Sequence, residues 1–592
     1  MKKKYVRWTL WTIASPFILF IILCILIYLP PIQNFLVDKA AVYASEATGM
    51  NISVGRISLS FPLNLVVTNV DAASPHNDTL LSVRRLQVNV QLLPLLKKQV
   101  EVDGISLQGA TVNSNDLIHG MKLNGTLGEL FISSHGVALD PETAIVNKVL
   151  LKDTDLSLCL NDTAAADTAA SDTTYWKIIL QDIDLQNVSF ALDMPLDSLS
   201  LAASLDNAIL RDGLIDLHKS AYSLQTFRIK NGRVRYDSGK PLAADSLPSG
   251  LDPSHIALTD IGVKLDSLYY GGRNMKAIIS QFVLKERSGV EIVSATGRMV
   301  SNDKVLRVPS LKLETRDSYL ELNAAMDWNA LDFKDEGLVS ARLMADIGKP
   351  DVVRFMGSMD EKFIRQYPSE PLRIRTGIDG DLNKLKLTTL TAELPGALGL
   401  FARGELTHLT DSLLRGGDIT LEAETKDLKF VSTLAEGIEI PYGTRLEGKF
   451  TMAGTKMGTD LLLMQPEAQA VVAADTIPIT VYNDSISVAD DFKMERAARL
   501  FAKYDLSRDR YEADLAVNHF DLHQFMPADS LYTLSTRLKV EGEGFDFFSP
   551  RTYFNAEGGI DRFHYGSYHL TGISLAAGLE KSKVHASLAV KN

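Results

Sequence analysis

The chain has 592 residues, of which 46% are hydrophobic and 23% are charged, and its formal net charge is −12. One hydrophobic core stops growing at about 250–300 residues, so several domains or one elongated repeat body are expected. The acidic balance argues against nucleic acid as a partner, because phosphate binding needs a basic surface.

Residues 8–29 (WTLWTIASPFILFIILCILIYL) carry no charge and predict a transmembrane helix of about 33 Å, at about 1.5 Å per residue. Basic residues at positions 2–4 and 7 precede it, so the positive-inside rule places the N-terminus in the cytoplasm. An uncleaved anchor is favoured over a signal peptide, whose apolar region is only about 7–15 residues long. The residues expected to hold this anchor in the bilayer are Trp8, Trp11, Phe17, Leu23, Tyr28 and Leu29.

Residues 30–50 predict a short helix that caps the following body beside the membrane. Pro31 suits a first helical turn, and Gly49 suits a left-handed end. Apolar residues between them recur at helical spacing.

From Asn51 onward the apolar period changes from 3.6 to 2, which indicates strand after strand. Residues 86–92 (LQVNVQL) alternate strictly between apolar and polar. Residues 183–192 (IDLQNVSFAL) alternate on both sides of a turn or bulge at Gln186 and Asn187. Because no βαβ alternation occurs, an antiparallel sheet is predicted.

Three segments predict interruptions of this pattern. Residues 100–113 (VEVDGISLQGATVN) predict short strands broken at Gly104 and Gly109. Short helices are expected at 351–366 and at 491–503.

A weak internal repeat runs through the second half of the chain. DVVRFM at 351–356 resembles DLHQFM at 521–526, and DLKF at 427–430 is a poorer copy. An alternating stretch with glycines follows each copy at a varying distance. The repeat is therefore one of supersecondary units rather than of a strict period.

Asp-Ser/Thr-apolar tripeptides are scattered along the chain. Turn chemistry explains them, because Asp and Ser start turns. O-glycosylation of an exported protein is the alternative hypothesis. The tripeptides begin at Asp78, Asp197, Asp266, Asp411 and Asp529.

The sequence shows no recognisable catalytic motif, and neither enzymatic activity nor a cofactor is expected. It lacks a G-x-S-x-G elbow, a Walker A loop and a G-x-G-x-x-G fingerprint. His519 and His523 have i, i+4 spacing but lack the glutamate of an HExxH zinc motif. Cys24 and Cys159 are the only cysteines, so neither an intramolecular disulfide nor a cysteine metal site is predicted.

Several segments of the first hundred or so residues follow one another in a recognisable order. After the transmembrane helix comes a helix ending in Ala-Thr-Gly at 47–49, and then ISVGRISLSFPLNLVVTNV at 52–70. LLSVRRLQVNVQLLPLL at 80–96 and the segment at 100–113 complete the order. This pattern resembles the AsmA-like family, most closely its TamB branch. The characteristic C-terminal domain of that branch is not seen, so the chain is expected to be a fragment, and a shorter relative is the alternative.

The resemblance implies an elongated, curved antiparallel β-sheet groove with an apolar lining. Such a protein of a Gram-negative bacterium would be anchored once in the inner membrane, with its body in the periplasm. Its expected role is to guide lipids, held by their acyl chains, between the inner and outer membranes. The alternatives are assembly of outer-membrane β-barrel proteins with a barrel partner, by strand addition, and a purely structural tether.

The candidate lining residues come from the alternating apolar sets. Alternation alone leaves open whether these residues line a groove or fill a closed β core. The candidates are Leu86, Val88, Val90, Ile183, Leu185, Phe190, Leu385 and Leu387.

The expected organisation has five parts. They are a basic tail and anchor (1–29), the capping helix (30–50), an AsmA-like N-terminal β region (51–160), a low-complexity loop (161–174) and a repetitive antiparallel β body (175–592), truncated at its C-terminus.

Overall fold

The structure is a computed structural model. It describes residues 39, 41–42, 45, 50–60, 64–74, 79–91, 102–114, 120–138, 142–161, 175–239, 250–332, 336–357, 359–434, 437–466, 494–546, 548–581 and 583–590.

The prediction of an all-β protein is confirmed. The described residues form 28 strands, with 72% of residues in strands and 7% in helices. The chain divides into an N-terminal unit, Met1–Thr296, and a C-terminal unit, Gly297–Asn592. Strand β13 (Glu291–Ser301) contains the division. Within each unit the strands belong to one sheet.

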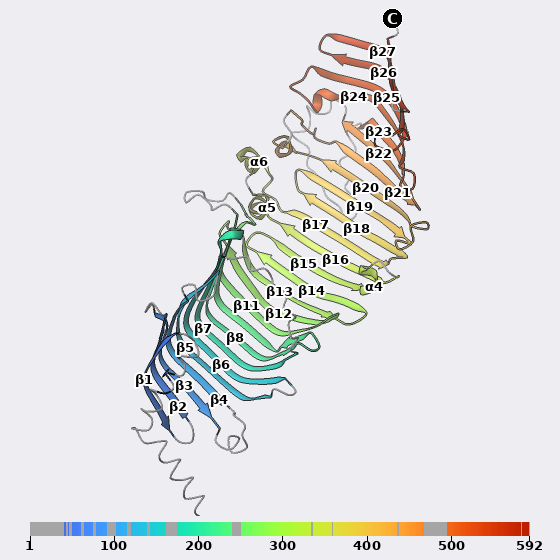
Figure 1. Cartoon of the computed structure of the whole chain (residues 1–592). Coiled ribbons are helices and arrows are strands. Elements are labelled where there is room, and N and C mark those ends of the chain that lie inside the picture. Colours follow the sequence, from blue (N-terminus) through green and yellow to red (C-terminus); the bar gives the residue numbers. More distant parts are fainter. Residues whose placement is uncertain are drawn as a thin grey trace, which may run out of the picture. The chain divides into compact units, whose positions relative to one another are not determined.

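In the N-terminal unit, strands that follow one another in the chain lie side by side in the sheet (Figure 1). Strands β9 and β10 lie end to end, since both pair with β8 and with β11. The short 3-10 helix η1 (Pro195–Asp197) joins β7 to β8. The strands are β1 (Asn51–Ser60), β2 (Asn64–Ala73), β3 (Thr79–Val90), β4 (Val102–Asn113), β5 (Met121–Ala138), β6 (Thr143–Leu160), β7 (Lys177–Met194), β8 (Leu199–Asp216), β9 (Ala221–Leu224), β10 (Thr226–Ser238), β11 (His255–Gly271) and β12 (Asn274–Glu286).

One pair departs from the predicted antiparallel order. Strands β6 and β7 are parallel, with Thr143 beside Lys177 and Cys159 beside Asp193. A parallel pair needs a connection of about a dozen residues or more. The connection at 161–176, which includes the predicted low-complexity loop, meets that need, so composition marked the loop but not the change of direction.

A line of unpaired residues crosses the N-terminal unit, and we call it the crease. At the crease each strand from β1 to β8, and β10 and β11 after them, carries a residue that is left out of the pairing register. Where φ is positive, the crease residue is Asn, Asp or Gly, which tolerate the left-handed region best. The positive-φ residues at the crease are Asn69, Gly109, Asp153, Asn187, Asn231 and Asp260.

The crease corrects one sequence prediction and refines another. Strand β4 is continuous from Val102 to Asn113, so the predicted break at Gly104 and Gly109 is wrong. Gly109, with φ 62°, bends the strand without ending it. The turn or bulge predicted at Gln186 and Asn187 is a left-handed residue without a register shift: Asn187 has φ 51°, and its Nδ2 donates to Asp153 Oδ1 over 2.9 Å.

The Asn187→Val variant is expected to lose about 1–2 kcal/mol of unfolding free energy, since a β-branched residue suffers in the left-handed region. Asn187→Gly should change stability by less, because glycine adopts positive φ freely. Urea unfolding of both variants measures the difference. Equal stability of the Val and Gly variants would contradict this account of the crease.

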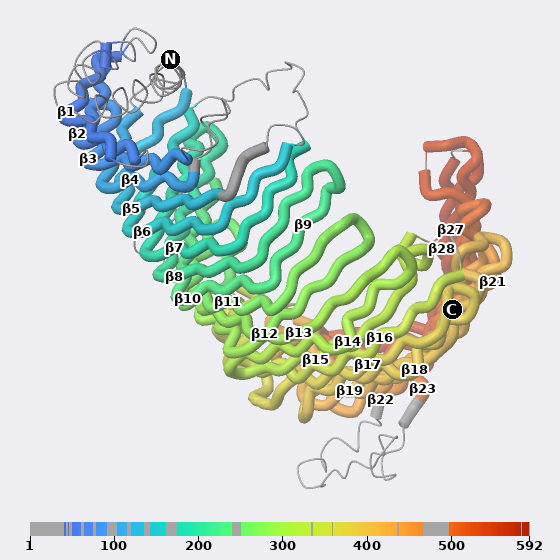
Figure 2. The backbone as a smooth tube through the Cα atoms, turned by 90° about the horizontal axis from the view of Figure 1, so that it is seen from below, coloured from blue at the N-terminus to red at the C-terminus, as the bar shows by residue number. Residues whose placement is uncertain are grey.

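In the C-terminal unit every strand from β14 to β28 pairs antiparallel with the next one (Figure 2). The strands are β14 (Val305–Thr315), β15 (Tyr319–Asp327), β16 (Leu338–Ile347), β17 (Leu372–Asp381), β18 (Lys384–Leu394), β19 (Leu398–Thr407), β20 (Gly416–Thr425), β21 (Arg445–Ala453), β22 (Lys456–Pro466), β23 (Met494–Asp505), β24 (Arg510–Asp521), β25 (Leu531–Glu543), β26 (Tyr553–Tyr565), β27 (Tyr568–Glu580) and β28 (Lys583–Val590).

The helices predicted in this unit have different outcomes. The helix expected at 351–366 is present as two, α5 (Lys349–Met356) and α6 (Glu361–Gln366). The helix expected at 491–503 is wrong, because β23 begins at Met494. Pairing with β22 on one side and β24 on the other overrides the helix-favouring composition of β23.

The internal repeat corresponds to a structural one. Its copies follow β16, β20 and β24, that is, every fourth strand and hence the same edge of the sheet. Each copy forms a helical turn: α5, α7 (Lys429–Ser432) or η3 (Leu522–Gln524). In the second and third copies the opening aspartate accepts a hydrogen bond from the turn it starts: Asp427 from Lys429 N over 3.1 Å, and Asp521 from His523 N over 3.1 Å.

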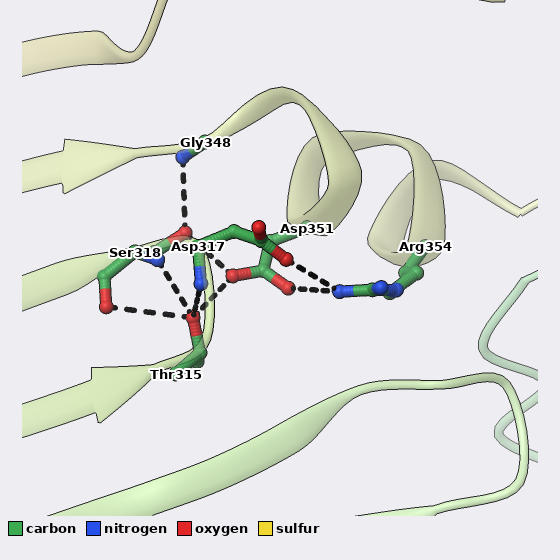
Figure 3. A network of polar contacts seen from close by, with 6 residues as sticks. All are labelled: Thr315, Asp317, Ser318, Gly348, Asp351 and Arg354. Carbon is green, nitrogen blue, oxygen red and sulfur yellow. Dashed lines mark hydrogen bonds and ion pairs between the residues drawn. The ribbon is translucent and has the colours of Figure 1, made fainter.

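The first copy is fixed by a buried carboxylate. Asp351 is only 1% exposed and accepts hydrogen bonds from the hydroxyls of Thr315 and Ser318, the latter over 2.6 Å (Figure 3). Arg354 Nη1 lies 3.0 Å from Asp351 Oδ1 and 2.9 Å from Asp317 Oδ2. This network ties α5 to the turn between β14 and β15.

The best-defined hydrophobic core lies under the second copy, where α6 meets α7. Phe430 of α7 has ring centroids 5.6 Å from Phe363 and 5.1 Å from Tyr367. Leu394 and Ala397, at the turn between β18 and β19, complete the buried cluster. Elsewhere in the unit, α4 (Trp328–Leu331) packs on a smaller cluster around Val339 and Leu382.

The N-terminal predictions fall largely outside the described residues. Of the capping helix, residues 39, 41, 42 and 45 are described and helical. Ser45 joins this segment to the first strand, since Ile52 N donates to Ser45 Oγ over 3.0 Å. Within the ranges described above, no helix is both long and apolar enough to cross a bilayer. The predicted anchor at 8–29 is not among them.

Candidate functional site

One face of the C-terminal sheet is apolar from β14 to β28. In an antiparallel pair, residues directly opposite each other point to the same face. Following these partners from strand to strand gives a row that we call the leucine row. Its members are Leu311, Leu322, Leu343, Thr376, Leu390, Ala402, Leu421, Gly448, Leu461, Leu500, Leu515, Leu538, Gly558, Leu575 and Leu588.

Parallel rows on both sides of the leucine row have the same character. One row contains Ile374, Leu400 and Leu463, and another contains Leu387 and Ile419. With about 4.8 Å between strands, these rows extend about 67 Å across β14 to β28. We call this surface the apolar face.

The opposite face is polar and carries cross-strand ion pairs. Lys449 Nζ lies 2.8 Å from Asp418 Oδ2, and Arg499 Nη2 lies 2.5 Å from Asp460 Oδ2. These pairs are largely exposed, so each contributes little to stability. They nevertheless fix which face meets water.

The described residues place no second layer over most of the apolar face. None of the leucines in the leucine row is fully buried. Leu538, Leu575 and Leu588 are 36%, 41% and 67% exposed. A closed β core would bury such side chains almost completely, so this surface is available to an apolar ligand.

An open cavity of about 520 Å³ lies on the apolar face across β19 to β24. Its floor is made of small residues, including Gly417, Ala502 and Ala513. Phe450 and Met457 are among the large residues around it. Its volume is in the range of small-molecule sites, which is about 300–1,000 Å³.

Aromatic rings stand at the end of the cavity that is nearest to the hairpin turns. Tyr504 and Tyr511 face each other across β23 and β24 and belong to the lining. Phe545, from the turn after β25, stacks on Tyr511 with centroids 5.1 Å apart and planes at 16°. Its centroid is 6.1 Å from that of Tyr504.

The same edge holds a strongly hydrogen-bonded carboxylate. Asp505 accepts from Ser507 Oγ over 2.6 Å and from Thr455 Oγ1 over 2.9 Å. Hydrogen bonds from Ser507, together with the one from Thr455, lower the pKa of Asp505 to about 2. A folded-state pKa below the unfolded one, about 3.9, gives stability above pH 4 that is lost as the pH falls toward 2.

Asp505→Asn should therefore be less stable than the parent chain at pH 5, and the gap should narrow at pH 3. Urea midpoints of both proteins at the two pH values measure it. A gap that is constant between pH 5 and pH 3 would contradict the assigned role of Asp505.

The N-terminal unit carries an apolar row of its own, beside the crease. It contains two of the predicted candidates, Leu86 and Leu185. The row is Ile57, Val67, Leu86, Leu107, Leu130, Leu151, Leu185, Ala208, Ile229, Val263 and Phe282.

Burial indicates that the apolar side is the inner side of the bend at the crease. Val83, Ala110 and Thr154, which lie next to the crease, are 5%, 9% and 2% exposed. The crease residues Asp153 and Asn187 are exposed. The bend thus brings apolar side chains together and turns the polar crease toward water.

The structure places the remaining candidates as follows. Val88 and Ile183 belong to one row, two residues further from the crease than Leu86 and Leu185. Val90 is half-buried opposite Val102. Phe190 lies beyond the crease and is 38% exposed.

The two candidates of the C-terminal unit, Leu385 and Leu387, both belong to the apolar face, where Leu385 pairs with Leu406. The cavity residues were missed. Their signal in the sequence is a cluster of glycine and alanine at apolar-face positions, which only the register brings together.

No metal-binding constellation of three or more His, Cys, Asp or Glu side chains occurs among the described residues. His523 stacks on Tyr532, with centroids 4.8 Å apart. His519 has φ 47° and lies at a bulge.

Most of the Asp-Ser/Thr motifs lie at exposed turns. Ser198, Ser412 and Ser530 are exposed, whereas Ser267 lies half-buried within β11. Asp411 Oδ1 accepts from Leu413 N over 2.8 Å, which is the turn chemistry expected of these motifs. O-glycosylation stays a prediction, which intact-mass measurement of the expressed protein tests.

Comparison with known protein-family models gives no match to this chain, and comparison with curated proteins gives none.

Proposed function

We propose that this protein guides lipids along its apolar face as a membrane-anchored periplasmic bridge between the inner and outer membranes. The observation that carries the proposal is the uncovered leucine row from β14 to β28. An acyl chain laid on such a surface gains about 0.8 kcal/mol for each buried CH₂, while its headgroup stays in water. The resemblance to AsmA-like proteins supports the same role.

A row of similar apolar groups lets a chain slide without losing contact. Each step exchanges one set of methyl groups for an equivalent set, so barriers along most of the face are small. The sequence holds no ATPase motif, so direction would come from lipid supply and demand at the two membranes.

Adjacent leucines on opposite faces provide a matched test. Leu461 belongs to the leucine row, whereas Leu462 points to the polar face, opposite Glu447 and Arg499. A photoreactive benzoylphenylalanine replaces either residue in the full chain, expressed in Gram-negative cells grown with radioactive phosphate. Illumination should attach phospholipid at position 461 and at least tenfold less at 462.

Equal labelling at the two positions, or none at either, would overturn the proposal. No labelling at either position would leave the structural tether as the better account. Cross-linking of an outer-membrane barrel protein instead of lipid at position 461 would favour the assembly alternative.

A further inference from the structure

We propose that the cavity across β19 to β24 is a discrete holding station for one acyl chain, rather than one more stretch of a uniform track. This inference rests on the proposed function, because it takes the occupant to be a lipid. It adds that lipids pause at one place in the C-terminal unit and that small residues on the floor determine where.

The floor of the station follows from the register. Ala502 and Ala513 are directly opposite each other, in the row where Phe450 and Val540 present larger side chains. Gly417 lies in the neighbouring row, opposite Met452, where the Leu406 side chain packs beside it at the cavity wall. Missing side-chain volume at adjacent positions produces the cavity of about 520 Å³.

The gap allows an acyl chain to be contacted on more than one side. On the flat leucine row a chain touches protein on one side only. Within the cavity it also meets Phe450, Met457 and Tyr511. Since apolar stabilisation scales with the area removed from water, residence at this place should exceed that elsewhere on the face.

Charge complementarity selects the occupant. The charged side chains of β21 and β22, such as Lys449 and Asp460, lie in rows of the polar face, where they pair with Asp418 and Arg499. The apolar-face positions around the cavity carry no charge, so an occupant that is uncharged along its length is favoured. Cations follow at the adjacent edge, where Lys456 precedes Met457 and Arg510 precedes Tyr511. Both belong to a row of the polar face, opposite Asp505. This order suits an apolar chain that ends in an anionic head.

Two carboxylates at this edge are already engaged. Asp505 accepts from Ser507 and Thr455, and Asp509 Oδ1 accepts from the Tyr504 hydroxyl over 2.8 Å. Lys456 and Arg510 are exposed at the same edge. Glu543 lies opposite Arg510 in the register, so an anionic headgroup would meet both cations and a carboxylate here.

Phe545 closes the edge end of the station. Its ring covers Tyr511, although the side chain is still 60% exposed. The preceding Gly544 has φ 80°, which lets the turn fold back toward the face. Phe545 thus limits how far a chain extends toward the turns.

The test compares two places on the face. Benzoylphenylalanine replaces either Met457, beside the cavity, or Leu575, in the leucine row outside it. Each full-length variant is expressed in cells that contain radioactive phospholipid, and the cells are illuminated. With a station, position 457 should label at least fivefold more than position 575. A uniform track predicts equal yields.

Larger side chains on the cavity floor test whether the small floor residues cause the stronger labelling at position 457. Ala502→Leu and Ala513→Leu occupy the gap, and the cavity gives the added carbons room. Each should reduce labelling at position 457 at least fivefold and leave that at position 575 unchanged. Ala556→Leu, in the same row but outside the cavity, is the matched control and should alter neither.

The outcomes separate the two proposals. If position 575 labels but the yield at 457 is equal or insensitive to both fillings, the station is wrong and the conduit stands. If neither position labels in the parent chain, both proposals fail. Unfolding free energies of the filled variants within about 1 kcal/mol of the parent, measured with urea, exclude unfolding as the cause of lost labelling.

Discussion

The Leu515→Asp variant should carry at least tenfold less lipid than the parent chain while keeping its strands. Leu515 lies in the leucine row between Leu500 and Leu538. A carboxylate at this position would have to be covered by an acyl chain, which costs several kcal/mol because no partner compensates the lost hydration. Since 1.4 kcal/mol corresponds to a factor of ten in the binding constant, even part of that cost lowers lipid occupancy at this position by tenfold or more.

The next residue provides the control. Ala516 points to the polar face, where its partners are Arg499 and Arg537. The Ala516→Asp variant adds the same charge to the same strand, but between two cations and in water. Lipid that co-purifies with the full chain is quantified by mass spectrometry, and strand content is followed by circular dichroism.

Equal lipid content in the two aspartate variants would refute the role of the apolar face. If Leu515→Asp loses its strands, Leu515→Ser replaces it as a milder polar change. A serine variant that is folded and fully loaded would count against the proposal in the same way.

The sequence predicts the apolar face because the face depends on period 2 alone. Leu385 and Leu387 are two apart in one strand, so alternation suffices to place them together. The same logic places Leu86 with Val88, and Ile183 with Leu185. For each pair the sequence predicts that the two side chains share a face, whereas only the pairing register shows which strands lie beside that strand.

The missed features are those that depend on partners distant in sequence. Strand β23 has a composition that favours a helix, yet its backbone groups form hydrogen bonds with two neighbouring strands. The parallel pairing of β6 with β7 cannot be predicted from either strand, since apolar alternation is the same in both chain directions. The crease was visible at Asn187, but its continuation through Asp153 and Gly109 requires knowledge of the register.

The cavity illustrates the same limit at the level of the site. Ala502 and Ala513 are unremarkable one at a time, because alanine is common in strands that pack closely. They form a cavity floor because they lie opposite each other and near Gly417. Volume that is absent from several strands at once cannot be read from any one of them.

The Asp351→Ala variant should lower the unfolding free energy of the C-terminal unit by about 2–4 kcal/mol. Removing this carboxylate leaves the Thr315 and Ser318 hydroxyls without their acceptor and deprives Arg354 of its buried partner. Hydrogen bonds to charged groups contribute about 1.5–3 kcal/mol each, and leaving buried partners unsatisfied adds to the loss. The network joins α5 to the turn before β15, so its loss should detach the helix first.

A second helix-capping aspartate calibrates this effect. Asp360 caps α6 at the surface, accepting from Lys362 N over 2.6 Å, and Asp360→Ala should cost only about 1 kcal/mol. Urea unfolding of the full chain gives both values, and hydrogen exchange of the α5 amides reports local detachment. Because the leucine row does not include α5, Asp351→Ala should bind lipid normally under native conditions. A cost equal to that of Asp360→Ala, or unchanged exchange in α5, would show that the buried network does not hold the helix in place.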